Sequence, residues 1–295
     1  MSLTDVITNE GEKIIYTPNI ISVLEEADNR IICHILDILE SGLSRISVKT
    51  SDSDVVIILL GFIDQFLNIV PELELFVDFN TGTNRKYINI NACYISLGKD
   101  ICFNLPFFHC FTGADSTCSF FKLLKKDWYS HWMIFPLKDS LNTAFQALSS
   151  CLTKEYVLNT QEIIQMFVAY AYSKKIDYDL DELRFNMFQK LSSNELRSLP
   201  PSNDALLLHT FRCAYQAGWV WGNSLTQCNP PPPELWGWKI YKDHLCIQWT
   251  SLDINYYLQM TFSICRCRTI SQCKCAKNKI LCLKYRNCCR KCGNI

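Results

Sequence analysis

The chain has 295 residues, of which 48% are apolar and 20% are charged. This composition indicates a folded chain with a sizeable core and excludes wholesale disorder. The 29 basic and 29 acidic residues cancel, but nine of the basic residues and none of the acidic ones fall in the last 31 positions. The other 264 residues therefore carry 20 basic and 29 acidic side chains, a formal charge of −9. An acidic body with a basic C-terminal segment predicts a negatively charged partner for that segment.

Neither a membrane span nor a secretion signal is visible in the sequence. The longest aliphatic run, Val55–Leu60, is far too short to cross a bilayer. The first residues, Met1–Asp5, have neither a basic n-region nor an apolar h-region. We therefore expect an intracellular protein without membrane association.

Residues 1–125 alternate between β-rich and helical patterns. A polar loop at 50–54 precedes the apolar run 55–62. Alternation of this kind favours an α/β domain with a mostly parallel sheet flanked by helices. The expected elements are strands at 13–16, 45–49, 73–79 and 87–90 and a helix at 20–41.

The rest of the chain divides into three further segments. Residues 126–228 are expected to form a helical extension, and 229–264 a linker module rich in Pro and Trp that closes it by packing. Residues 265–295 form a basic, cysteine-rich module. The helices expected in the extension span 139–152, 160–173, 180–191 and 204–225.

Eight of the 17 cysteines crowd into the C-terminal module. Without a secretion signal, clustered cysteines favour metal ligation over disulfides. Zinc prefers four thiolates in a tetrahedron, so eight thiols predict two zinc sites or one bridged cluster. The segment has too few apolar residues for a core, so metal binding would have to supply its folding free energy. The predicted ligands are Cys265, Cys267, Cys273, Cys275, Cys282, Cys288, Cys289 and Cys292. The alternative is a disordered basic tail, or disulfides in an oxidising compartment.

The paired Cys-x-Cys units, the lysine-rich middle and the final Cys289-x2-Cys292-x-Asn294 resemble the CXC domain of tesmin/TSO1-like proteins. This resemblance implies a zinc-thiolate cluster that binds DNA. Basic side chains here would neutralise phosphates rather than read bases. The residues expected to do so are Arg266, Arg268, Lys274, Lys277, Lys279, Lys284, Arg286, Arg290 and Lys291.

Three acidic spots in the α/β region are candidates for a site for Mg²⁺ or Mn²⁺. Glu26 and Asp28 lie in the first predicted helix, Asp52 and Asp54 follow a predicted strand, and Asp115 lies in a polar turn. Carboxylate oxygens are the ligands that these hard ions prefer. A pair of such ions can stabilise the attacking and leaving oxygens of phosphodiester hydrolysis. Each spot has a simpler interpretation as a solvated helix face, an N-cap or a turn.

The order Glu26-Ala27-Asp28, Asp52-Ser53-Asp54 and Gly113-Ala114-Asp115 resembles the PIN-like superfamily of flap-endonuclease (XPG)-type 5′-nucleases. More broadly, the chain is similar to mobile-element-associated animal proteins that join this domain to a cysteine-rich tail. The resemblance implies that the five carboxylates are catalytic. The family's opening strand and its Asp would precede residue 1, so residues 1–125 are expected to be N-terminally incomplete. The segment 120–126 also lacks the glycines that bring the family's backbone close to DNA phosphate.

Three functions are compatible with these patterns. The first is a nuclear, transposon-derived DNA-binding protein whose α/β domain is a metal-dependent endonuclease. The alternative is a non-catalytic, zinc-dependent DNA- or chromatin-binding protein with a degenerate nuclease fold. The third, less favoured, is a zinc-stabilised protein-interaction module without DNA binding, for which DNA affinity would depend little on salt. His109 is expected to pack rather than catalyse, and His209 to lie on a polar helix face.

Overall fold

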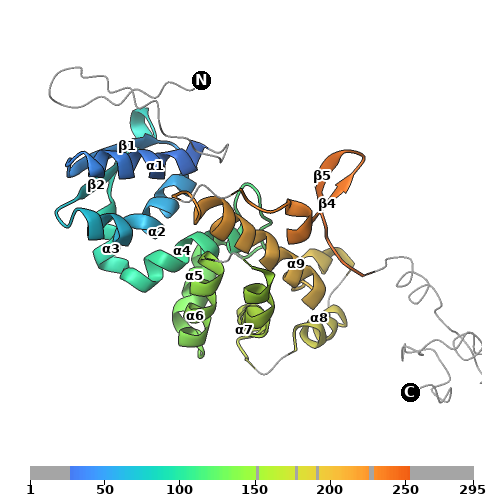
Figure 1. Ribbon diagram of the computed structural model, residues 1–295. Coiled ribbons are helices and arrows are strands. Elements are labelled where there is room, and N and C mark those ends of the chain that lie inside the picture. The colour runs from blue at the N-terminus through green and yellow to red at the C-terminus, as the bar shows by residue number, and fades with distance from the viewer. Residues whose placement is uncertain (1–26, 151–152, 177–178, 191–192, 226–228, 253–295) are drawn as a thin grey trace, which may run out of the picture. The chain divides into compact units, whose positions relative to one another are not determined.

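The computed structural model describes residues 27–150, 153–176, 179–190, 193–225 and 229–252 (Figure 1). Contacts within the chain divide it into a unit at 1–249 and a second unit at 250–295. The predicted strand at 13–16 and Glu26 lie outside the described residues. So do all eight predicted zinc ligands and all nine basic residues of the C-terminal module.

The first unit has an α/β architecture with a small mixed sheet, which confirms the general fold class. Strands β1 (Arg45–Thr50) and β2 (Glu74–Phe79) pair in parallel, and β3 (Lys86–Asn89) pairs antiparallel to β2. The β2–β3 connection is a tight turn with the single 3-10 turn η1 (Gly82–Asn84), too short for the crossover that a parallel pair needs. In the described residues this sheet therefore holds one parallel pair rather than a mostly parallel set.

The apolar run 55–62 lies in the N-terminal half of helix α2 (Ser53–Ile69), which connects β1 to β2. Its buried residues include Ile58, Leu59 and Phe66. Helix α1 (Ala27–Glu40) confirms the described part of the helix expected at 20–41, of which residues 20–26 lie outside the described residues. It packs against α2 with buried residues three to four apart, as its helical period requires. The chain passes from the carboxyl end of β1 almost directly into the N-terminus of α2. Asp52 and Asp54 lie at this junction.

Helices α3 (Ile90–Leu97) and α4 (Lys99–Thr112) follow β3 and were not anticipated from the sequence. Gly98 separates them with a φ of 84°, which an L side chain rarely adopts. Every residue of α4 from Asn104 to Thr112 is buried, so its sequence shows no amphipathic pattern. α4 packs against α2, α6 and α9 and is the central helix of the unit.

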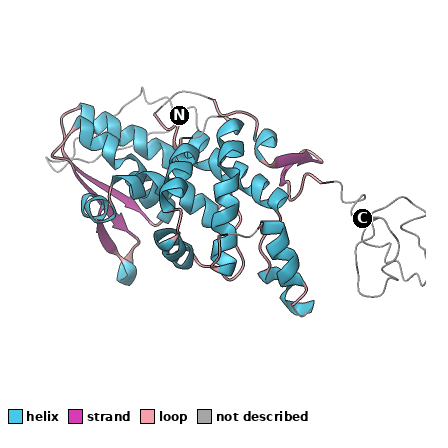
Figure 2. Ribbon diagram, turned by 90° about the horizontal axis from the view of Figure 1, so that it is seen from below, coloured by secondary structure: helices cyan, strands magenta, loops and turns pink. Residues whose placement is uncertain are grey.

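Most of the remaining described chain is helical, as predicted for 126–228 (Figure 2). The four expected helices correspond to α6, α7, α8 and α9, with ends shifted by up to several residues. Helix α9 continues as η3, a π-helical segment whose Gly222 N–H reaches the Ala217 carbonyl five residues back. The elements are α5 (Lys125–Ile134), α6 (Lys138–Ser149), α7 (Lys154–Ser173), α8 (Leu180–Phe188), η2 (Ser193–Ser198), α9 (Asn203–Ala214) and η3 (Tyr215–Trp221).

The Pro/Trp-rich segment forms η4 (Pro233–Trp236) and a hairpin of β4 (Trp238–Tyr241) and β5 (His244–Ile247). Trp236 and Trp238 are buried against Tyr215, which confirms packing for these two. Trp249 differs, because 63% of it is exposed. None of the helices in the described ranges is long and apolar enough to cross a membrane.

Candidate functional site

Asp52 and Asp54 lie where β1 ends and α2 begins. Asp52 is the N-cap of α2, and its Oδ1 accepts a hydrogen bond of 2.9 Å from the Asp54 backbone N–H. The Asp52 side chain is exposed, whereas that of Asp54 is only 14% exposed. The N-cap role explains Asp52 locally, since it satisfies a helix N–H that has no partner within the helix.

Asp54 is paired with His109, which comes from the last turn of α4. The Nε2 atom of His109 lies 2.8 Å from Oδ1 of Asp54, and the His109 side chain is 8% exposed. The hydrogen bond from His109 lowers the pKa of Asp54, with smaller contributions from the charges of His109 and Lys125, against a burial effect that raises it. Asp54 is therefore held as a carboxylate at neutral pH.

Lys125, the first residue of α5, places its amino group at the C-terminus of α4. Its Nζ donates to the backbone carbonyls of His109, at 2.9 Å, and of Gly113, and to Thr112 Oγ1 at 3.3 Å. A cation here satisfies carbonyls that the helix leaves unpaired and opposes the negative end of its dipole. Burial lowers the pKa of Lys125, while the charge of Asp54 opposes this effect. The geometry makes Lys125 a C-terminal cap for α4.

Asp115 lies in a turn that is held by its own neighbours. The Ala114 N–H donates to Thr117 Oγ1, which itself donates to the Cys110 carbonyl. Ser116 Oγ donates to Gln216 Oε1 in η3 at 2.9 Å. Asp115 itself is exposed. The turn is thus docked on α4 and η3, with the Asp115 side chain toward solvent.

Asp28 lies in the first turn of α1 and is half-buried. Its neighbour Asn29 is fully buried and accepts a hydrogen bond from Ser224 Oγ at 3.0 Å. Cys33, one helical turn on, donates its thiol to the Ser224 carbonyl. The start of α1 is therefore anchored to the segment that follows η3.

The predicted carboxylates do not assemble a metal site among the described residues. No three His, Cys, Asp or Glu side chains there are placed to share a metal ion. Asp54 has His109 on its Oδ1, Asp52 caps a helix, and Asp115 faces solvent. Mg²⁺ and Mn²⁺ need several oxygen ligands at once, and Asp28, Asp52, Asp54 and Asp115 do not form such a group in the described residues. Glu26, the fifth predicted carboxylate, lies outside these residues.

Sequence reasoning missed the partnership between His109 and Asp54. The two residues are 55 positions apart, and α4 carries no periodic pattern that would mark His109 as facing α2. The expectation of a polar face around His209 was wrong. His209 is buried, and its Nε2 hydrogen-bonds the Phe111 carbonyl at 2.8 Å. Burial lowers the pKa of His209 to about 4.

Comparison with protein-family models, with curated proteins and with solved structures gives no significant match.

Proposed function

We propose that this chain is a DNA-binding protein that is held on DNA by its basic C-terminal module. Its body is a nuclease-like α/β unit that does not hydrolyse DNA through the five predicted carboxylates. The observation that carries the second part is the Asp54–His109 pair. The resemblance to PIN-like nucleases implies that Asp54 is a metal ligand. In this structure its carboxylate is instead hydrogen-bonded to His109 and lies close to the charge of Lys125.

The C-terminal module supports the DNA-binding part through its composition. Eight thiols form a donor set that suits Zn²⁺, and nine basic residues without an acidic one attract phosphate. The remaining 264 residues carry a formal charge of −9, so DNA affinity should depend on this module. A nuclear location is part of the same proposal, because this module is basic and resembles DNA-binding CXC domains.

A metal-dependent 5′-nuclease is the second candidate, and one observation favours it. Asp52 and Asp54 both lie at the carboxyl end of β1 in a strand–helix–strand unit, the position at which ligand sites of parallel sheets collect. Asp52 also presents an exposed carboxylate there.

The first experiment measures DNA affinity of the zinc-loaded full chain by fluorescence anisotropy over a range of salt concentrations. We expect Kd to rise steeply with salt. Replacing Lys284, Arg286, Arg290 and Lys291 by Gln should lower the slope of log Kd against log salt by about 3 to 4, because each lost phosphate contact contributes about 0.9. A matched control replaces four lysines of the body by Gln, and it should leave the slope unchanged. These lysines are Lys122, Lys126, Lys174 and Lys175. An unchanged slope in the first variant would overturn the proposal.

The second experiment separates the two candidates. The same protein is incubated with flapped and single-stranded DNA in Mg²⁺ or Mn²⁺, beside a D52N/D115N variant. We expect binding without cleavage in both proteins. Cleavage by the natural sequence that disappears in the variant would establish the nuclease and contradict the non-catalytic proposal.

A further inference from the structure

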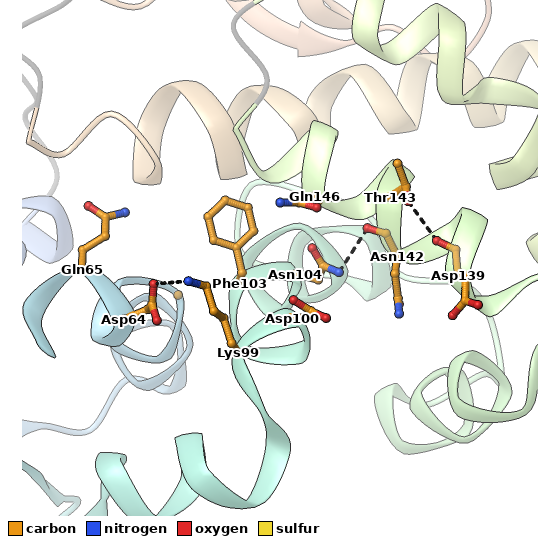
Figure 3. Close-up of a pocket in the computed structure, with 11 residues that line it drawn as sticks. Asp64, Gln65, Lys99, Asp100, Phe103, Asn104, Asp139, Asn142, Thr143 and Gln146 are labelled. Atoms are coloured by element: carbon orange, nitrogen blue, oxygen red, sulfur yellow. Dashed lines mark hydrogen bonds and ion pairs between the residues drawn. The ribbon is translucent and has the colours of Figure 1, made fainter. Parts of the chain in front are cut away.

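A polar cleft of about 430 Å³ opens between helices α2, α4 and α6, and neither Asp54 nor His109 lines it. Figure 3 shows Asp64 and Lys99 on one side, Asp139 on the other, and Phe103 and Asn104 between them. The Lys99 Nζ atom pairs with Asp64 at 2.9 Å. This volume falls in the range typical of small-molecule sites.

The cleft has an acidic end, where Asp100 and Asp139 are exposed to solvent. Lys99 is engaged by Asp64, and the ion pairs of the described part of the chain include neither Asp100 nor Asp139. Asp100 and Asn104 are four residues apart on α4 and so share a face. The Asn104 amide donates to the Asn142 carbonyl at 3.2 Å, which leaves its buried Oδ1 without a hydrogen-bond partner in the structure. Three acceptors therefore line a region with a formal charge of −2.

A smaller chamber of about 100 Å³ adjoins this cleft, because Gly61, Gln65 and Phe103 line both spaces. Its walls are largely apolar and include Phe62 and Pro106. Helices α2 and α4 approach closely here, since a Cβ on Gly61 would lie 2.7 Å from Pro106 Cγ.

Two residues that line the chamber have a buried polar atom without a partner in the structure. Trp221 is 2% exposed and Ser149 is 6% exposed, and neither the Trp221 indole N–H nor the Ser149 hydroxyl makes a hydrogen bond. Both residues line the chamber. An unsatisfied buried polar atom costs free energy, so a ligand group or an ordered water that pairs with it is favoured. Indole can only donate, and a hydroxyl can also donate, so both suit an acceptor.

From these two ends we infer that the cleft and chamber bind a small aromatic amine. Its ammonium group would lie among Asp100, Asn104 and Asp139, whose acceptors match the three N–H donors of an ammonium. Its ring would pack on Phe103 and Pro106, and an oxygen at its far end would accept from Trp221 and Ser149. The inference does not rest on the proposed function, because none of these residues belongs to the carboxylate site or to the C-terminal module.

Isothermal titration calorimetry on the full chain with three probes tests this site. Tyramine has the ammonium, the ring and the far oxygen. Phenethylamine lacks the oxygen, and 4-ethylphenol lacks the ammonium. We expect saturable binding of tyramine, with 4-ethylphenol at least tenfold weaker. Asp139→Asn should weaken tyramine about fivefold and leave 4-ethylphenol unchanged. Glu72→Gln removes the same charge from an exposed turn outside the cleft and should leave tyramine binding unchanged within twofold.

The inner end is tested by removing its donors. Trp221→Phe should weaken tyramine about fivefold and leave phenethylamine unchanged. Ser149→Ala provides the same comparison if Trp221→Phe does not fold. Absence of saturable tyramine binding would overturn the inference and leave ordered water as the partner of these atoms. The inference would also be overturned if 4-ethylphenol bound as tightly as tyramine, or if Asp139→Asn left tyramine binding unchanged.

Discussion

The Nε2 atom of His109 and the Oδ1 atom of Asp54 lie 2.8 Å apart and connect the last turn of α4 to the first turn of α2. Both side chains are mostly buried, at 8% and 14% exposure, so water screens the pair only weakly. A charge-assisted hydrogen bond in such a place contributes more than an exposed ion pair does. The hydrogen bond between His109 and Asp54 therefore stabilises the packing of α4 against α2 and also engages the Asp54 carboxylate.

Asp54→Asn should lower the free energy of unfolding at pH 7 by about 1 to 2 kcal/mol, because it removes the charge that His109 stabilises. The folded-state pKa of Asp54 lies below its ordinary value of 3.8. Its contribution is therefore complete above that pH and is lost as pH falls through the folded value. Urea unfolding at pH 7 and at pH 3 measures the difference, which should shrink in acid.

A double-mutant cycle with His109→Gln isolates this pair from other effects of each change. We expect a coupling free energy of about 1 kcal/mol at pH 7. Additive single effects at pH 7 would show that the contact contributes nothing to stability.

His209 should make the protein less stable as pH falls from about 6.5 to about 4. In the folded protein its pKa is about 4 because of burial, against an ordinary value of 6.5. Between these values the unfolded chain binds more protons, so stability rises with pH, by at most about 3 kcal/mol over this window. His209→Gln should remove that slope. Urea unfolding at intervals from pH 4 to pH 8 measures it, and an unchanged slope in the variant would contradict the assignment.

Lys125→Met should destabilise the protein by about 1 to 2 kcal/mol, because the carbonyls of His109 and Gly113 lose their donor at the end of α4. Lys126→Met is the matched control. Lys126 is exposed, and this substitution removes the same charge from the neighbouring position. Thermal and urea unfolding compare the two variants. Equal effects would mean that charge, rather than capping, determines the change.

Gly113→Ala should destabilise by about 2 kcal/mol or more. Gly113 has a φ of 115°, and a Cβ there would lie 2.7 Å from the Cβ of Ser119. Gly42→Ala is the control, because Gly42 also has a positive φ, of 86°, but no atom lies within 4 Å of its would-be Cβ. It should cost only the backbone strain, about 1 kcal/mol. If both variants lose the same stability, crowding by Ser119 is not a significant term.

The local patterns of this sequence were sufficient for several elements. β1 and β2 follow from short β-rich runs between polar turns, and α6 and α7 from apolar residues at helical spacing. Asp115 was correctly placed in a turn, because Gly113 ends α4 just before it. The composition of residues 265–295 also led directly to the zinc and DNA predictions, which concern residues beyond those described.

The partners of the candidate residues were beyond the reach of such patterns. α4 is buried nearly all round, so neither its existence nor the direction of His109 left a periodic signal. The pairing of His109 with Asp54, and the convergence of Asp100, Asn104 and Asp139 on one cleft, join segments that are tens of residues apart.

The sequence by itself thus determined the α/β class, five of the nine α-helices of the described residues and the charge division between body and C-terminal module, since these depend on local periodicity and composition. Only the tertiary structure decided that Asp54 has an imidazole as its partner and that the chain contains an acidic cleft. Those outcomes depend on how helices distant in sequence pack together, because packing alone sets which buried polar groups meet.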